Sequence, residues 1–294
     1  MITAGRVAAA ASVLLNESIA AHAVANLSGE AHWRMQTKAG AAFVKAIAAD
    51  LDPPFPAEAA GLHELRKAGA IRVPDVWAVG RTEQLSLIVI EWLDLRPGST
   101  ASDAALGSGL AAIHRTTAPR FGWHTANTIG ASPQYNAWND SWTEFFRNQR
   151  LRYQLELATT NAGSADIRWI DRGRRLCERV SELLEGHRPQ PSLLHGDLWS
   201  GNRAATAGDR PVIFDPAVYF GDREADIAMT RLFGGFSAAF YQAYQDSWPV
   251  GPGFAMRETL YNLYHVLNHF NLFGAGYRGQ AQDMIDRLLA ELGH

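Results

Sequence analysis

Residues 192–202 read SLLHGDLWSGN, an apolar run that leads into a loop of polar side chains and glycine. Asp197 stands two positions after His195, and Asn202 stands five positions after Asp197. A tight loop of this length can hold one carboxylate against a hydroxyl group and a second oxygen ligand against a metal ion. The same residue types also suit a helix-capping aspartate and a turn asparagine, so the motif alone leaves both interpretations open.

The spacing His-x-Asp-x-x-x-x-Asn is that of the catalytic loop in protein-kinase-like folds. In this interpretation Asp197 is the catalytic residue, because its carboxylate accepts the proton of the acceptor hydroxyl. Asn202 is then a metal ligand that binds Mg²⁺ through its side-chain carbonyl. Trp199 lies inside the same loop and is either a contact to the substrate or an anchor in the core.

A second acidic residue follows this loop. The run PVIFDPA, residues 211–217, reads as a short buried strand that ends on Asp215, thirteen positions after Asn202. Kinase-like folds place their second metal ligand at such a position. Pro216 and Ala217 replace the phenylalanine and glycine of protein kinases, and a proline fixes φ and removes a backbone donor. The two segments together favour a kinase of small molecules over a protein kinase.

The residues before the loop predict a small lobe rich in strands. Residues 26–49 read as two strands joined by a turn at 38–40, the second ending on Phe43, Val44 and Lys45. The chain contains only three lysines, so Lys45 is a candidate contact to the α and β phosphates of a nucleotide. A solvated lysine at the end of a strand is the simpler alternative.

A helix is expected next, because Phe55, Ala59, Leu62 and Leu65 recur at helical spacing after prolines at 53, 54 and 56. Glu58 lies in its first turn, where it can pair with Lys45. The helix dipole alone also favours an acidic residue at this position.

Two further strands are expected in residues 71–80 and 85–95, the second apolar on both faces. The backbone at Glu91, Trp92 and Leu93 would contact an adenine edge, and LRPGSTAS, which follows, would be the hinge between the lobes.

The loop expected to cover the phosphates is poor in glycine. Only Ser28 and Gly29 are available there to bring backbone amides close to the nucleotide. Weak nucleotide binding is one consequence, and a hydroxyl group with few amides is the alternative.

After the hinge the pattern becomes helical. Leu106, Leu110 and Ile113 mark one helix, and aromatic residues from Trp138 to Gln149 mark another. Further helices are expected around Cys177 and at 222–234, 236–247, 255–271 and 277–292.

Composition indicates a chain of 294 residues with a large core, 47% hydrophobic and 19% charged. A net charge of −3 provides no basic surface for nucleic acid, and no run of residues is apolar enough to span a membrane. The apolar N-terminus imitates a secretory signal, but Glu17 closely follows its short apolar run, which favours an opening helix. The single cysteine suits a reducing compartment, so we expect a cytoplasmic protein. We also expect a monomer, with a dimer left open.

Several stretches together resemble the fructosamine-3-kinase (ketosamine-3-kinase) family, relatives of the aminoglycoside phosphotransferases. They are LLHGDLWSGN, FDPAVYFGDREADIAMTRLFGGF, LYHVLNHFNLFG, NAWNDSWTEFFRNQRL and FPAEAAGLHEL, spread over nearly the whole chain. The resemblance implies an α+β, protein-kinase-like bilobal fold. Residues 1–93 would form a small antiparallel-sheet lobe that binds the nucleotide, and residues 94–294 a larger, mainly helical catalytic lobe.

The resemblance further implies transfer of the γ-phosphoryl group of ATP, with Mg²⁺, to the 3-hydroxyl of a ketosamine. The phosphorylated adduct would then release the amine, so the role would be deglycation repair of a glycated protein or metabolite. Trp199, Glu224 and His269 are candidate contacts to this substrate, although Glu224 could instead pair with Arg223, and His269 could be a core histidine.

Two other functions stay open at this point. An aminoglycoside or choline-like kinase would need an acidic or aromatic cluster around a cationic acceptor, and Glu224, Asp226 and Asp140 could build an acidic one. A nucleotide-binding module without catalysis has only the glycine-poor loop in its favour.

Overall fold

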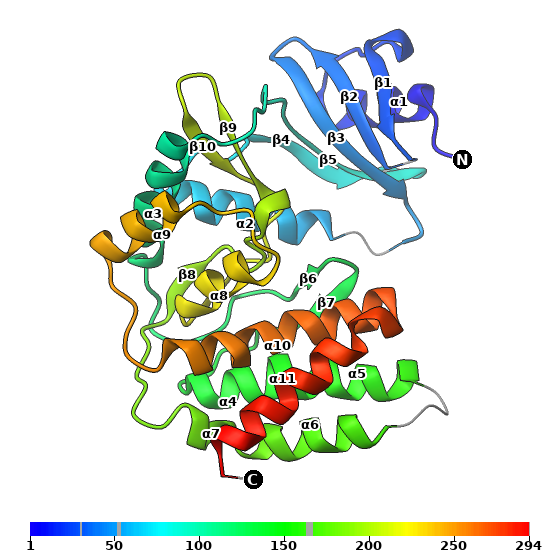
Figure 1. Ribbon diagram of the computed structural model, residues 1–294. Helices are drawn as coiled ribbons and strands as arrows, with labels where there is room; N and C mark the ends of the chain where they lie inside the picture. Colours follow the sequence, from blue (N-terminus) through cyan, green and yellow to red (C-terminus); the bar gives the residue numbers. More distant parts are fainter. Residues whose placement is uncertain (30, 52–53, 163–166, 294) are drawn as a thin grey trace.

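A five-stranded antiparallel sheet forms the N-terminal part of the computed structural model, which describes residues 1–29, 31–51, 54–162 and 167–293. The strand order is β1-β2-β3-β5-β4. The strands are β1 (Val24–Ser28), β2 (His32–Thr37), β3 (Gly40–Ala48), β4 (Val76–Arg81) and β5 (Leu85–Glu91). In Figure 1 the sheet lies at one end of the molecule, and the larger helical part lies at the other.

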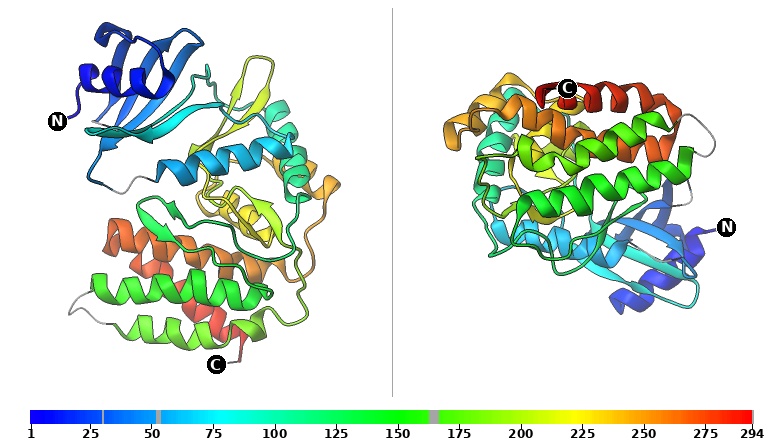
Figure 2. Two further views of the ribbon diagram at one scale, coloured as in Figure 1. Left: turned by 180° about the vertical axis from the view of Figure 1, so that it is seen from behind. Right: turned by 90° about the horizontal axis from the view of Figure 1, so that it is seen from below.

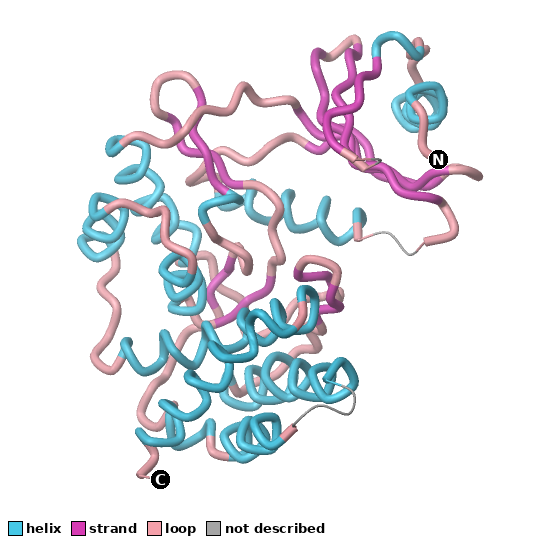
Figure 3. The backbone as a smooth tube through the Cα atoms, turned by 45° about the vertical axis from the view of Figure 1, so that its right-hand side comes forward, coloured by secondary structure: helices cyan, strands magenta, loops and turns pink. Residues whose placement is uncertain are grey.

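Both faces of the sheet are covered, as the apolar run in β5 predicts. Leu85, Leu87 and Val89 pack with β3 and helix α1 (Ala4–Leu15) on the outer face, which Figure 3 shows turned away from the helical part. Ile88 and Ile90 point to the opposite face, toward helix α2 (Phe55–Ala68). Since side chains alternate along a strand, Lys45, between buried Val44 and Ala46, faces the α2 side.

Two expectations for this region need comment. The opening helix is confirmed as α1, capped by the Thr3 hydroxyl, and no helix in the described part of the chain is long and apolar enough to cross a membrane. Lys45 was expected at the end of its strand, but β3 continues to Ala48, so Lys45 lies in the strand interior. Lys45 pairs with Ile88 of β5, and the pairing of the two strands continues to Ala48 and Leu85.

Helix α2 begins at Phe55, with Pro56 in its first turn, and buries the four predicted apolar residues. Pro53 lies outside the described residues. The apolar side of α2 joins Ile88 and Ile90 to the core of the helical part, so one hydrophobic core runs from the sheet into the helices.

The rest of the chain is mainly helical. Helices α4, α5 and α6 pack beside α10 and α11 at the far end from the sheet, as both views of Figure 2 show. The helices are α3 (Thr100–His114), α4 (Trp142–Phe146), α5 (Tyr153–Ala162), α6 (Arg168–Glu178), α7 (Val180–Leu183), α8 (Glu224–Leu232), α9 (Ala238–Ser247), α10 (Phe254–Phe273) and α11 (Arg278–Glu291). The predicted helices are present. Trp138 is the exception, because the Ser141 side chain caps α4 and leaves Trp138 in the preceding loop.

Three short antiparallel pairs complete the fold. They are β6 (Asn127–Ile129) with β7 (Ser132–Gln134), β8 (Ser192–Leu194) with β11 (Tyr219–Gly221), and β9 (Arg203–Thr206) with β10 (Arg210–Ile213). The segment after β5 is tied to the third pair, because Arg96 and Ala205 exchange backbone hydrogen bonds of 2.8 and 3.0 Å. An α+β fold of two lobes is therefore confirmed, and a boundary at residues 93 and 94 stays a prediction.

Candidate active site

The loop SLLHGDLWSGN leaves β8 and closes in a short 3-10 turn at Ser200–Asn202 before β9 begins. Gly196 is required here on two counts. Its φ is +81°, and a Cβ atom would lie 2.0 Å from the carbonyl oxygen of Ala217. The loop can thus lie directly against the segment that carries Asp215.

The buried carboxylate of Asp226, on α8, holds this loop in place. The backbone N–H groups of His195 and Gly196 donate to its two oxygens at 2.8 and 2.9 Å, and His114 donates to it at 3.1 Å. Burial raises the pKa of Asp226. The hydrogen bond and charge of His114, together with the hydrogen bond from the Gly196 N–H, outweigh burial and bring this pKa below its ordinary value. Asp226 therefore stays ionised and braces the loop, a role that sequence reasoning did not assign to it.

His195 links the loop to the chain that follows β10. Its Nε2 donates to the carbonyl oxygen of Phe214 at 3.0 Å, and its Nδ1 accepts from the N–H of Asp197 at 3.3 Å. Burial lowers the pKa of His195, so the ring is neutral with its proton on Nε2. The loop and the segment that carries Asp215 are thus positioned by one imidazole.

Asp197 lies beside Asn202, as their spacing predicts. Asn202 Nδ2 donates to the backbone oxygen of Asp197 at 2.9 Å and to its carboxylate at 3.2 Å, which leaves Asn202 Oδ1 as the atom for a metal ion. Burial raises the pKa of Asp197 to about 7, helped by the negative charges of Asp215 and Asp226 and opposed by the Asn202 hydrogen bond. A carboxyl group with this pKa is well matched to proton transfer near neutral pH.

Lys45 joins the two lobes through ion pairs. Its Nζ lies 2.8 Å from Glu58 Oε1 and 2.5 Å from Asp215 Oδ1. Burial lowers the pKa of Lys45, but the two carboxylates outweigh burial and raise it, so the ammonium group is charged. Asp215 has a φ of +54°, a conformation that is costly outside glycine and is found at functional sites.

Three adjoining cavities meet at these residues. The central one, about 350 Å³, is lined by the ion pairs together with Asp197, Trp199 and Asn202. A second, about 450 Å³, continues past Asp215 to Phe43, Ile90 and the segment from Glu91 to Leu95. A third, also about 450 Å³, continues from Asp197 and Trp199 toward His269 on α10. From the second cavity through the central one to the third, the order matches that of a nucleotide base, its phosphates and an acceptor in a kinase.

The predicted hinge lines the second cavity. The N–H groups of Glu91 and Trp92 donate to the carbonyl oxygens of Asp75 and Ala41, while the Glu91 carboxylate pairs with Arg72. Among the described residues no hydrogen bond is found for the N–H of Leu93. Of the three predicted hinge residues, Leu93 is thus the one whose backbone donor is unpaired within the described part of the chain.

Ser28 is the last residue of β1 and Gly29 lies in the turn after it, and neither lines any of the three cavities; Leu27, next to Ser28, lines the second. The Ser28 hydroxyl is hydrogen-bonded to His32 at 3.2 Å.

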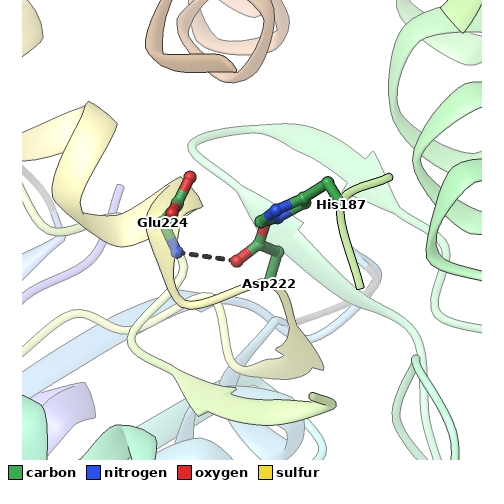
Figure 4. Close-up of side chains that lie close together, drawn as sticks. All are labelled: His187, Asp222 and Glu224. Atoms are coloured by element: carbon green, nitrogen blue, oxygen red, sulfur yellow. Dashed lines mark hydrogen bonds and ion pairs between the residues drawn. The ribbon is translucent and has the colours of Figure 1, made fainter. Parts of the chain in front are cut away.

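Glu224 is brought to a different place. Figure 4 shows it at the start of α8 with Asp222 and His187, a cluster with the residue types of a metal site. However, Arg257 binds both carboxylate oxygens of Glu224 at 2.6 and 3.0 Å, and Asp222 accepts hydrogen bonds from His187 and Tyr261. The cluster is a buried structural network, and Glu224 lines none of the three cavities. Nor does it pair with Arg223, which donates to Tyr244 and the backbone after α9.

The donor set of the central cavity fits Mg²⁺. Asp215 has carboxylate oxygens and Asn202 an amide oxygen at this cavity, hard donors of the kind that this ion prefers. The close approach of Lys45 to Asp215 marks the same spot as one that attracts positive charge.

Protein-kinase-like phosphotransferases share this arrangement of a lysine-bearing sheet, a hinge and paired metal-binding loops. Within that class the chain belongs to the fructosamine kinase family, whose family model matches residues 8–291.

Individual relatives agree with this assignment. A probable ketoamine kinase of Synechocystis is 48% identical over 248 residues, which cover 84% of this chain and 82% of that protein. A chloroplastic protein-ribulosamine 3-kinase of Arabidopsis thaliana is 42% identical over 87% of this chain and 78% of its own length. The crystal structure of a putative fructosamine-3-kinase from Thermobifida fusca is similar with a TM-score of 0.87 and 32% identity, covering 97% of this chain and 99% of that one.

Proposed function

We propose that this protein is an ATP-dependent kinase that phosphorylates the 3-hydroxyl of a ketosamine of the fructosamine or ribulosamine type. Its family membership and relatives named ketoamine kinase and protein-ribulosamine 3-kinase support this substrate class. One structural observation carries the reaction. Asp197 lies at the wall shared by the phosphate cavity and the acceptor cavity, where a base must stand.

Each candidate site residue has a role in the transfer. The hinge at Glu91, Trp92 and Leu93 positions adenine, and Lys45, held by Glu58, contacts the phosphates. Asp197 accepts the proton of the acceptor hydroxyl as the hydroxyl oxygen attacks the γ-phosphorus of ATP, and ADP leaves as the bond to its β-phosphate oxygen breaks. Asn202 and Asp215 would hold Mg²⁺, which supplies neutralisation of phosphate charge when bound.

The alternative of a cationic acceptor such as an aminoglycoside or choline loses the acidic cluster that the sequence offered for it. The three acidic residues considered for it are engaged elsewhere: Glu224 with Arg257, Asp226 with the catalytic loop, and Asp140 with Arg120 on the surface. None of them lines the acceptor cavity.

In the cell the reaction would reverse glycation, because the phosphorylated adduct is unstable and releases its amine. We propose that the substrate is a small ketosamine or a glycated protein, with no part for nucleic acid or a membrane, and that the protein acts in the cytoplasm as a monomer. The nucleotide-binding lobe would be residues 1–93, and the catalytic lobe residues 94–294.

The decisive experiment compares phosphate transfer from ATP to fructosyl-lysine, ribulosyl-lysine and erythrulosyl-lysine with transfer to kanamycin and choline. We expect phosphorylation of one or more ketosamines, with the phosphate on O3 by NMR. Turnover of kanamycin or choline alone would overturn the proposal.

A further inference from the structure

The guanidinium group of Arg203 is held on several sides. Arg203 follows Asn202 in the chain and is the first residue of β9. Its Nη1 lies 2.5 Å from Oδ1 of Asp103, on α3, in an ion pair whose two side chains are only 12% and 6% exposed. Its Nη2 donates to the carbonyl oxygen of Gly235, and its Cζ lies 4.9 Å from the centroid of the Phe236 ring. One side chain thus contacts both α3 and the loop between α8 and α9.

Asp103 and Gly98 complete the surroundings of this guanidinium group. The second carboxylate oxygen of Asp103 accepts a hydrogen bond of 3.1 Å from the N–H of Ser237, in the α8–α9 loop. Gly98, in the segment between the lobes, lies so close that a Cβ atom there would collide with the Arg203 guanidinium. The segment between the lobes, the first turns of α3, the end of the catalytic loop and the α8–α9 loop therefore meet at one side chain.

The catalytic loop ends directly before Arg203. Asn202 lines the central cavity, and its backbone oxygen accepts a hydrogen bond of 3.1 Å from the N–H of Phe214. Asn202 is thereby also tied to the segment that carries Asp215. A shift of the Arg203 backbone would therefore move the candidate metal ligand.

The α8–α9 loop begins at a wall of the acceptor cavity, the third of the three cavities. Phe233 lines this cavity and stands two residues before Gly235. Phe233, Phe273 and Tyr277 surround the His269 ring at centroid distances of 4.9, 5.5 and 5.0 Å. The position of Gly235 therefore influences where this aromatic wall lies.

The ion pair of Arg203 and Asp103 has a geometric role. Neither residue is among the described residues that line the three cavities, so neither is placed to touch the nucleotide or the acceptor. Buried ion pairs can often be replaced by apolar residues of similar size without loss of stability. The planar guanidinium group, however, donates in fixed directions to Asp103 and Gly235 at once, which the single nitrogen of a lysine cannot do in the same geometry. Arg203 therefore fixes the distance between two loops.

We propose that Arg203 is a positioning residue for phosphoryl transfer, because it fixes the acceptor wall at Phe233 relative to the metal ligand Asn202. An acceptor bound against that wall then has its hydroxyl group beside Asp197 and in line with the γ-phosphate. A misplacement of about 1 Å can lower a rate by about 10²-fold, so a link between the two loops matters although it touches no substrate. The inference rests on the proposed function and adds a residue that lies outside the site.

Arg203→Lys tests the link, because lysine keeps a positive charge beside Asp103 but loses the simultaneous hydrogen bond to Gly235. We expect kcat/KM for the ketosamine to fall by about tenfold or more, while the calorimetric affinity for Mg-ATP without acceptor stays within about twofold. An unchanged kcat/KM would overturn the inference. An equal loss of Mg-ATP affinity would also overturn it, because Arg203 would then act on the metal ligand alone.

Arg172→Lys is the matched control. Arg172, on α6, also joins two elements through its guanidinium group, which donates to Asp286 of α11 at 2.7 and 3.2 Å. These helices lie at the end of the molecule far from the sheet (Figure 2), so both kcat/KM and Mg-ATP affinity should stay at the wild-type values. If Arg203→Lys proves unfolded by circular dichroism, Arg203→Met combined with Asp103→Leu removes both charges together and should show the same loss of kcat/KM.

A double-mutant cycle tests whether Arg203 acts through the acceptor wall. Phe233→Leu changes the wall directly. If Arg203 acts through Phe233, the loss of kcat/KM in the variant with both Arg203→Lys and Phe233→Leu is smaller than the product of the two single losses. Losses that simply multiply would overturn the inference. If the wild type phosphorylates no ketosamine, the proposed function itself fails and the inference falls with it.

Discussion

At the scale of single residues, the site depends on how burial and neighbouring charges set each protonation state. Asp197 and Lys45 are both surrounded by protein, yet Lys45 faces two carboxylates and Asp197 faces other negative groups. The two carboxylates therefore hold Lys45 charged, while burial, with the negative charges of Asp215 and Asp226, raises the pKa of Asp197 to about 7.

Replacing Asp197 by Asn should separate chemistry from binding. The amide keeps the size of the side chain but cannot accept the hydroxyl proton, so turnover should fall by about 10² to 10⁴ while Mg-ATP still binds. Turnover and calorimetric ATP affinity are the measurements. Asp140→Asn, at an exposed surface ion pair, is the control. Near-normal turnover of Asp197→Asn would remove Asp197 from the catalytic role.

Replacing Lys45 by Ala should weaken ATP binding, because the phosphates lose their cation and Glu58 is left buried without a partner. Lys67→Ala removes a lysine that is 74% exposed and pairs, within the described residues, with Glu64 alone, so it controls for the loss of one charge. Calorimetry measures both affinities, and circular dichroism checks that each variant is folded. Unchanged affinity in Lys45→Ala would show that Lys45 does not hold phosphate.

At the scale of elements, local sequence patterns predicted well the helices and strands and the contacts between elements that are close in the sequence. Helical spacing gave α2 its buried face, and the pairing of Lys45 with Glu58 followed from a strand beside a helix start. What could not be predicted depends on contacts between distant segments. The brace from Asp226 to the loop at His195 and Gly196, and the ring cluster around His269, exist only once α8 and α10 have packed. Glu224 was misplaced for the same reason, since its partner Arg257 lies on α10.

The close packing of the catalytic loop predicts that Gly196 tolerates no side chain. Gly196→Ala adds a strained positive φ and a contact with Ala217 that one of the two segments must relieve by moving. Gly208→Ala is the matched control, because its φ is +76° but nothing lies within 4 Å of the added Cβ. Gly208→Ala should cost about 1 kcal/mol, and Gly196→Ala clearly more together with most of the turnover. Urea unfolding and kinetics give both quantities, and equal behaviour of the two variants would contradict the steric argument.

At the scale of the whole molecule, the two lobes are connected by more than a linker. The core under α2 is continuous with the helical core, Arg96 pairs with β9, and Lys45 reaches Asp215 across the cleft. The sequence predicted two lobes from the change in pattern after residue 93, but not this continuity, which depends on which side of α2 meets which helices. The protein should therefore unfold as one cooperative unit, and its global stability can report on a single buried group.

His265, inside α10, is such a group. Burial lowers its pKa to about 3, with Arg150 acting in the same direction and the negative charge of Asp226 opposing. In the unfolded chain a histidine has a pKa of about 6.5, so between these values the unfolded state binds a proton that the folded state does not. His265 therefore has no effect on the pH dependence of stability above about pH 6.5. Below that pH it lowers the free energy of unfolding, by up to about 1.4 kcal/mol per pH unit. The carboxylates of Asp222 and Asp226, whose pKa values are lowered, act only in more acidic solution, whereas Asp197, whose pKa is raised to about 7, acts in the same range with the opposite sign. The difference between the wild type and a His265 variant therefore isolates the contribution of His265.

Replacing His265 by Gln should flatten this dependence, because the glutamine side chain does not titrate. Urea unfolding of the wild type and of His265→Gln at several values between pH 7.5 and pH 4.5 measures the two slopes. The His63→Gln variant, at an exposed position on α2, controls for the loss of one histidine. His265→Gln will be less stable at pH 7.5 if its amide is left unsatisfied in the core, so the slope and not the absolute stability is the test. Parallel slopes in the wild type and His265→Gln would show that His265 does not couple folding to acid.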